Sequence, residues 1–339
     1  MAKSKARRRK KKTGLRLAPP PPRLPVIEPD TEDWELVESQ LAVALPVERI
    51  MSLVTFGLAH REVQSPEEAQ DLLASFSEEK FERLVAEVRA AGPRRHAQDL
   101  AYEAMIEAND EKEATGLATR ALGLDPDCLD AMAVLAECGS GSPEQLLAEL
   151  ERIADKGRRL FPPERFAQVR DEVWEELELR PFLRALFRLG DAYRTLQRPE
   201  EGIAVLEELM ALNPADQQRA REPLLSCCLA AGRLERAREL LARFPEDDSA
   251  VFHWGRVLER FLGGDEHGAV RALRNAEAQN PHAAAYMTMS RKPPSQLPET
   301  YEPGGKDEAV HCLYMAGTAW AAHPDAILWA RDVRQGGPG

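Results

Sequence analysis

Cysteine and aromatic residues are scarce in this sequence. Its 339 residues include five cysteines, an odd number, and no two of them form a C-x-x-C motif. This usage is not that of a disulfide-stabilised domain and favours a reducing compartment, so we expect the protein in the cytoplasm. Aromatic residues make up 6% of the chain, and no segment shows the alternation of Val, Ile and Thr with polar residues that marks a strand. The abundance of Ala, Leu, Glu and Arg instead favours an all-α fold.

Long hydrophobic runs are missing as well. The longest apolar stretch covers residues 50–59, whereas a membrane-spanning helix needs about 20 apolar residues. No apolar segment follows the basic N-terminus in the way of a secretory signal peptide. Hydrophobic residues nevertheless make up 43% of the chain, enough for a sizeable core. The sequence therefore predicts a protein that builds a core but does not enter a membrane.

Motifs that indicate an enzyme or a bound metal are also absent from the sequence. It contains no G-x-S-x-G, Walker A or H-E-x-x-H motif, and no carboxylate pair isolated in an apolar setting. The pairs His311-Cys312 and Cys227-Cys228 come nearest to a metal site, but adjacent residues on a helix point about 100° apart. Cys227 and Cys228 are better explained as buried small apolar residues. We expect no catalytic residue, cofactor or metal.

Charge is distributed unevenly along the chain. Residues 1–16 carry nine of the 45 Lys and Arg and no acid, so the remaining 36 basic residues face 57 acidic ones, a net of -21. The basic run Lys3–Arg16 and the proline run at 19–25 cannot build a core, so residues 1–30 are expected to be a disordered tail. Two interpretations of this tail stay open: a solubility arm without a fixed partner, or a tether to RNA, the ribosome or another polyanion.

The clearest motif is the stretch 183–214, LRALFRLGDAYRTLQRPEEGIAVLEELMALNP. On a 34-residue frame that starts at Leu183, it has the apolar, Gly, Tyr, small and Pro residues of a tetratricopeptide repeat (TPR). Small residues at frame positions 8 and 20 let the two helices of such a repeat approach closely, and the proline ends the second helix. The residues that carry the motif are Leu186, Leu189, Gly190, Tyr193, Gly202, Leu206 and Pro214.

Two further frames follow, starting at residues 218 and 250, which gives spacings of 35 and 32 residues. The second frame has a turn glycine and a small residue in register, and the third has a small residue and a terminal proline. These residues are Gly232, Ala237, Ala269 and Pro281. A fainter hairpin covers 95–126. The sequence thus predicts a right-handed, TPR-like solenoid of helical hairpins.

Changes in composition, together with Pro and Gly residues that end helices, divide the chain into regions. The N-terminal helical region either caps the solenoid or forms a separate small bundle, and the last helical region is a cap on the open end of the array. In order, we expect a tail at 1–30, N-terminal helices at 31–92, degenerate TPR-like helices with a spacer at 93–180, the core array at 181–285, a Pro/Gly-rich linker at 286–305 and the C-terminal cap at 306–333.

Arginines mark one helix face as a candidate binding surface. The first helix of the 183–214 motif presents polar residues on one side, and two more arginines begin the next repeat. TPR arrays usually bind peptides on the concave surface lined by their first helices, so these arginines could hold a carboxylate or an acidic peptide. The alternative is ordinary surface charge. The candidates are Arg184, Arg188, Asp191, Arg194, Arg219 and Arg221.

These observations favour a non-enzymatic scaffold that binds a protein or peptide, with a ribosome- or nucleic-acid-associated factor tethered by residues 3–16 as the alternative. Salt would separate the two, because a complex held by the tail weakens steeply with ionic strength. The tail-driven complex should also vanish when residues 1–18 are deleted. The sequence leaves the partner and the oligomeric state open.

From about residue 95 onward the chain resembles the suppressor-of-tumorigenicity-7 proteins and their shorter bacterial relatives. The stretches that carry the resemblance include CLDAMAVLAE at 128–137, the 183–214 motif, NPHAAAYMTMSRKPP, and GGKDEAVHCLYMAGTAWAAHPDAILW. The Asn280-Pro281-His282 corner and the Asp307-Glu308-Ala309 helix with Trp320 are its more specific parts. The resemblance implies a TPR-like fold and an interaction role, without catalytic residues. Animal members look like membrane proteins, whereas this chain begins with a basic, Pro-rich tail, so membrane residence does not carry over.

Overall fold

A computed structural model describes residues 40–60, 77–169, 172–292, 294, 297–298 and 300–336 of the chain. Among these residues it contains sixteen α-helices and no strand, which confirms the predicted all-α, helical-hairpin architecture. The expected tail at 1–30 lies outside the described residues. The chain divides into two compact units. Among the described residues, those between Ala44 and Leu160 belong to the first unit, and residues 40–43 and those from Phe161 onward belong to the second.

The described part of the first unit contains six helices, of which α1 begins four residues before the unit does. Two hairpins, α4 with α5 and α6 with α7, pack in succession, and α3 packs on α4. The helices are α1 (Gln40–His60), α3 (Glu78–Ala90), α4 (Pro93–Ile106), α5 (Glu111–Leu124), α6 (Leu129–Gly139) and α7 (Pro143–Leu160).

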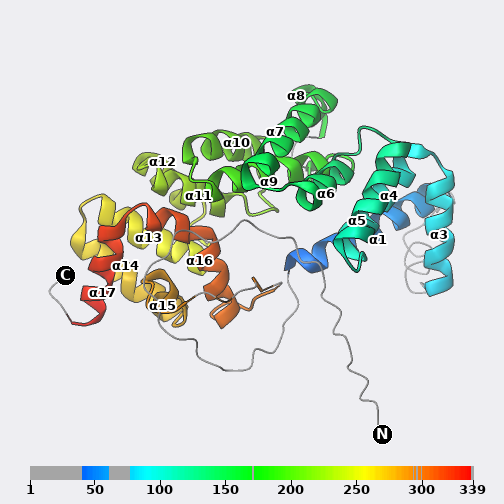
Figure 1. The fold of residues 1–339 in the computed structure, drawn as a ribbon. Coiled ribbons are helices and arrows are strands. Elements are labelled where there is room, and N and C mark those ends of the chain that lie inside the picture. The colour runs from blue at the N-terminus through cyan, green and yellow to red at the C-terminus, as the bar shows by residue number, and fades with distance from the viewer. Residues whose placement is uncertain are drawn as a thin grey trace, which may run out of the picture. The chain divides into compact units, whose positions relative to one another are not determined.

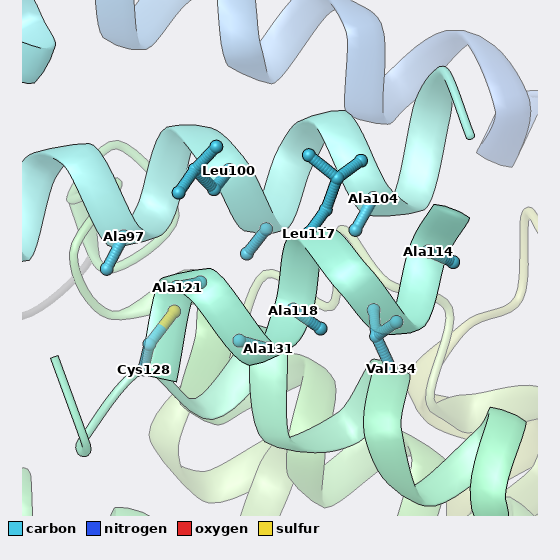
Figure 2. Close-up of a cluster of buried hydrophobic side chains, with 11 residues drawn as sticks. Ala97, Leu100, Ala104, Ala114, Leu117, Ala118, Ala121, Cys128, Ala131 and Val134 are labelled. Carbon is cyan, nitrogen blue, oxygen red and sulfur yellow. The ribbon is translucent and has the colours of Figure 1, made fainter. Parts of the chain in front are cut away.

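Small side chains line the core of the first unit. Ala97, Ala118, Ala121 and Ala131 are fully buried where α4, α5 and α6 meet, with Leu100 beside them (Figure 2). Alanine occupies little volume, so the helix backbones come close together and large side chains are not needed to fill the space. This packing explains why the 95–126 hairpin forms from an Ala-rich sequence with few repeat-signature residues.

The second unit contains three consecutive hairpins followed by a C-terminal group of helices (Figure 1). In each hairpin the first helix packs on the second, and α11 contacts both α9 and α13. The hairpin helices are α9 (Arg180–Thr195), α10 (Pro199–Leu212), α11 (Arg221–Ala230), α12 (Leu234–Arg243), α13 (Ala250–Leu262) and α14 (Glu266–Gln279). The others are α8 (Pro163–Val169), α15 (Ala283–Met287), α16 (Lys306–Ala321) and α17 (Pro324–Arg334).

The small residues of the repeat frame lie at the closest helix contacts. A Cβ atom on Gly190 would be 2.5 Å from Leu206 Cγ, so this glycine lets α9 and α10 approach. A Cβ atom on Gly202 would be 2.8 Å from Cys227 Sγ, so the second glycine brings α10 against α11 of the next hairpin. Ala237 and Ala269 take the corresponding places in α12 and α14 and are fully buried.

The turn glycine and the terminal prolines of the frame lie outside the helices. Gly232 has a φ of +66° in the turn between α11 and α12, a left-handed conformation that favours glycine. Pro214 and Pro281 follow the ends of α10 and α14 and are exposed. The signature residues Leu186, Leu189 and Leu206 are buried, as is Tyr193.

Helix α16 packs against the side of the hairpins. It packs against α11 and α13, which are first helices of two hairpins, and it reaches α9 through hydrogen bonds (Figure 1). The sequence assigned residues 306–333 to a cap on the end of the array. In the structure α17 packs on α13 and α16, while α16 covers the side of the first helices on which a TPR array usually binds a peptide.

Candidate interaction surface

The surface of α9, α11 and α13 that faces α16 is called the inner face below. Three contacts fix the direction of α16 on it. His311 lies 2.8 Å from Glu222, Thr318 lies 3.2 Å from Ser226, and His323 lies 2.9 Å from the carbonyl oxygen of Leu229. Since both sets of residues ascend in order, α16 runs in the same direction as α11, the middle first helix.

Asp191 and Arg194 anchor α9 to α16. Arg194 is 2% exposed, and its guanidinium donates to Asp191 Oδ1 at 2.8 Å and to the carbonyl oxygens of Tyr314 and Met315 at 2.7 and 3.2 Å. The Tyr314 hydroxyl donates to Asp191 Oδ2 at 2.6 Å. Burial raises the pKa of Tyr314 and the Asp191 carboxylate adds to the shift, so the phenol stays protonated and donates. Two residues of the predicted binding face are therefore engaged by the chain itself.

Arg219 and Arg221 belong to a second network, at the start of α11. Arg221 pairs with Asp216 at 2.8 Å and with Asp247 at 2.6 Å. Arg219 donates to Glu222 Oε1 at 2.8 Å. Three carboxylates thus surround two guanidinium groups, and the network has no surplus positive charge to attract an acidic ligand.

Glu222 joins this second network to α16. Its side chain is 1% exposed and contacts both Arg219 and His311. Burial by itself would raise the pKa of the carboxyl, but His311 and Arg219 outweigh it and hold the pKa below its usual value. The Tyr301 ring stacks on the His311 ring with centroids 4.7 Å apart, and burial raises the pKa of Tyr301 to about 12. The carboxylate is therefore ionised and fully engaged at neutral pH.

Arg184 and Arg188 complete the predicted set. Both are half-buried and lie one helical turn apart on α9, N-terminal to Asp191 and Arg194. Both also have interaction partners within the chain. The structure thus divides the six predicted residues into the Asp191–Arg194 anchor, the Arg219–Arg221 network, and a half-buried pair on the first half of α9.

A buried carboxylate also ties α16 to the last hairpin. Glu308 accepts hydrogen bonds from the Ala250 backbone N–H at 2.9 Å, from the Asn280 side chain at 2.9 Å and from the Gly304 backbone N–H at 2.7 Å. It therefore satisfies the N-terminus of α13, where backbone N–H groups have no partner within the helix. The Asn280-Pro281-His282 corner and the Asp307-Glu308-Ala309 helix start, separate in sequence, meet at this point.

The polar stripe of α16 was not identified from the sequence. Its members are Glu308, His311, Tyr314 and Thr318, at spacings of 3, 3 and 4 residues. Such spacing puts side chains on one face of a helix, so the pattern was available as a signal. Trp320 packs edge-on against Trp254 of α13, with ring centroids 5.3 Å apart.

The pairs His311-Cys312 and Cys227-Cys228, considered above as metal ligands, have other contacts or are buried. Within the part of the chain that the structure describes, no three His, Cys, Asp or Glu side chains are placed to hold a metal ion. His311 points to Glu222, whereas the Cys312 sulfur lies 3.9 Å from that of Met287. All five cysteines are free, and burial raises the pKa of both Cys227 and Cys228 to about 12. The described helices also include none that is both long and apolar enough to span a membrane.

A tetratricopeptide-repeat family model matches residues 184–216, which contain most of α9 and all of α10. A search of curated proteins finds no match to the chain, so the resemblance to the suppressor-of-tumorigenicity-7 proteins stays a prediction. The basic segment at residues 3–16 lies outside the described residues, and its role also stays a prediction. By sequence match and by its glycine-mediated packing, the α9–α10 hairpin is similar to a tetratricopeptide repeat.

Proposed function

We propose that the protein is a cytoplasmic, non-enzymatic scaffold that binds a protein partner through its second unit. The observation that carries this proposal is the TPR-like hairpin at 184–216, stacked on two hairpins with the same small-residue packing. Stacked hairpins of this class expose long helix faces, which suit the capture of extended or helical segments. Five free cysteines agree with a reducing compartment.

The first half of α9 is the part of the predicted binding face that we assign to the partner. Asp191 and Arg194 are covered by α16, and Arg219 and Arg221 are neutralised by three carboxylates. This leaves the Arg184–Arg188 pair, which is half-buried and partly open to solvent. Guanidinium groups bind carboxylates with two parallel hydrogen bonds, so an acidic peptide is the partner chemistry that fits, in exchange for contacts within the chain.

The test is a charge reversal with a matched control. The double variant Arg184→Glu/Arg188→Glu should lose the proteins that the wild-type chain retains in affinity capture. The control variant Arg233→Glu/Arg236→Glu makes the same change in charge at the start of α12, where both arginines are more than half exposed, and should retain them. Circular dichroism checks that helix content is unchanged. If both double variants retained the partner proteins equally well, the assignment of the Arg184–Arg188 pair to the partner would be wrong.

A further inference from the structure

We infer that α16 is an exchangeable ligand built into the chain, and that a partner helix with the same polar stripe displaces it from the inner face. This inference rests on the proposed function and extends the partner site from the Arg184–Arg188 pair to the part of the inner face that α16 covers. The partner it identifies is an amphipathic helix with hydrogen-bonding side chains at the places of His311, Tyr314 and Thr318, and a large aromatic residue at that of Trp320.

The inner face contains buried polar groups as well as apolar ones such as Trp254. Beneath α16 lie Asp191, Arg194, Glu222 and Ser226, all buried, and three of the four are charged. Burying charge is costly unless every group is paired, and a permanent core is built from apolar residues instead. These polar groups would be satisfied by water if α16 left. Hydration of these groups lowers the cost of uncovering the inner face.

Packing beneath α16 is also incomplete. A pocket of about 140 Å³, partly open to solvent, lies between the C-terminal ends of α9 and α11 and helix α16, lined among others by Arg194, Cys227 and Thr318. The Nη2 atom of Arg194 has no hydrogen-bond partner of good geometry there, although it lies 2.7 Å from Asp191 Oδ1. Part of the contact energy of a tightly packed core is therefore missing from this interface, which lowers the cost of exchange.

The hairpins also contact one another directly. Helix α10 packs on α11, and α11 packs on α13 through the contact at Gly255, where a Cβ atom would lie 2.5 Å from Leu225 Cδ2. Helix α16 follows these hairpins in the chain and is separated from α15 by residues 288–305. Release of α16 and α17 would leave the three hairpins stacked.

The tether gives α16 a large advantage over any free competitor. An intramolecular ligand on a short linker acts at an effective concentration of about millimolar. A free helix of equal intrinsic affinity, present at about micromolar concentration, would therefore occupy the inner face in only about one molecule in a thousand. Exchange becomes measurable when the tethered helix binds the inner face less tightly, or when the free helix binds it more tightly.

The probe for this exchange is a fluorescently labelled peptide of residues 304–336, and the readout is its anisotropy on titration with full-length protein. Trp320→Ala in the full-length chain removes the contact with Trp254 from the tethered helix alone. We expect the peptide to bind this variant at least about a hundredfold more tightly than wild type, given the usual cost of removing a buried tryptophan. The milder variant His311→Ala should show a gain of about tenfold.

A disulfide lock supplies the decisive control. The Ser226 and Thr318 hydroxyl oxygens lie 3.2 Å apart, so cysteines at both positions are close enough to form a disulfide between α11 and α16. In the Trp320→Ala background, Ser226→Cys/Thr318→Cys should abolish peptide binding when oxidised and restore it when reduced. Ser226→Cys alone, in the same oxidant, controls for the five native cysteines.

The exchange model is overturned if oxidation leaves peptide binding unchanged, or if Trp320→Ala and His311→Ala, with helix content intact, bind no better than wild type. Should Trp320→Ala lose its helix content, His311→Ala takes its place as background for the lock. These measurements use only the chain and its own peptide. If the peptide measurements fail while Arg184→Glu/Arg188→Glu still loses partner capture, only the exchange model is wrong and the proposed function stands. If the peptide measurements succeed while that double variant retains its partners, only the assignment of the Arg184–Arg188 pair to the partner is wrong.

Discussion

Replacing Gly190 with alanine tests the packing argument most directly. The added Cβ atom would lie 2.5 Å from Leu206 Cγ and 2.6 Å from Leu206 Cδ2. Carbon atoms in contact are normally about 3.5–4.0 Å apart, so Leu206 or the whole of α10 must move by about 1 Å. Both residues lie inside helices and Leu206 is fully buried, so the side chain has little room to turn away.

Two effects of opposite sign compete at this position. Glycine inside a helix costs about 0.5–1 kcal/mol relative to alanine, so Gly190→Ala gains that amount from the backbone. Overpacking a close contact costs about 1–3 kcal/mol. We expect the contact to dominate, with a net loss of about 1 kcal/mol or more in the free energy of unfolding. In a Leu206→Ala background the same substitution should become favourable, because its Cβ atom then enters space that the leucine has left.

Urea unfolding followed by circular dichroism measures these changes. The matched control is Gly116→Ala in the middle of α5, an exposed position where a Cβ atom meets nothing within 4 Å. It should stabilise the first unit by about 0.5–1 kcal/mol, because only the backbone gain remains. If Gly190→Ala stabilised the second unit as much as Gly116→Ala stabilises the first, the glycine would not set the distance between α9 and α10, and our account of the repeat packing would fail.

Two further predictions concern the second unit. Because the pKa of Glu222 is lowered on folding, its ionised form adds stability above the unfolded pKa of about 4.3, and this is lost as the pH falls through the folded pKa. Glu222→Gln should therefore cost about 1–3 kcal/mol at pH 7 and progressively less below pH 4, measured by urea unfolding; an equal cost at all pH values would contradict this. Gly232→Ala should lower the free energy of unfolding by about 1 kcal/mol because φ is +66°, and Gly232→Asn by less; equal losses would mean that the left-handed backbone is not the cause.

Much of the helical framework could be predicted because its signals are local. The apolar and small residues of the 183–214 frame recur at helical spacing, and the turn at Gly232 needs a residue that accepts a positive φ. The start of α7 at Ser142-Pro143 also has a local cause, because Ser142 and Gln145 form a capping box. In the structure the Gln145 N–H donates to the Ser142 hydroxyl oxygen at 3.3 Å, and the Gln145 side chain accepts from the Gly141 N–H at 2.8 Å.

The binding face could be predicted only in part, because its state depends on distant residues. Asp191 and Arg194 were recognised as polar residues on one side of α9, but Tyr314 and Met315, which engage them, lie more than 110 residues away. Nothing in the local sequence of α9 tells whether these groups face solvent or another helix. The arginines of the next repeat posed the same problem, since Asp247, which pairs with Arg221, comes from the chain after α12.

The sequence by itself determined that this protein is helical, where its hairpins turn, and which small residues allow their helices to touch. These properties follow from backbone preferences and from side-chain volume within about 34 residues of chain. Only the tertiary structure decided that α16 covers the inner face and that its polar stripe pairs with the charges of α9 and α11. The physical reason is that a helix face has no fixed environment until another segment is placed on it. The same arginine is a ligand site when exposed to water and an internal anchor when a carboxylate and two carbonyl oxygens surround it.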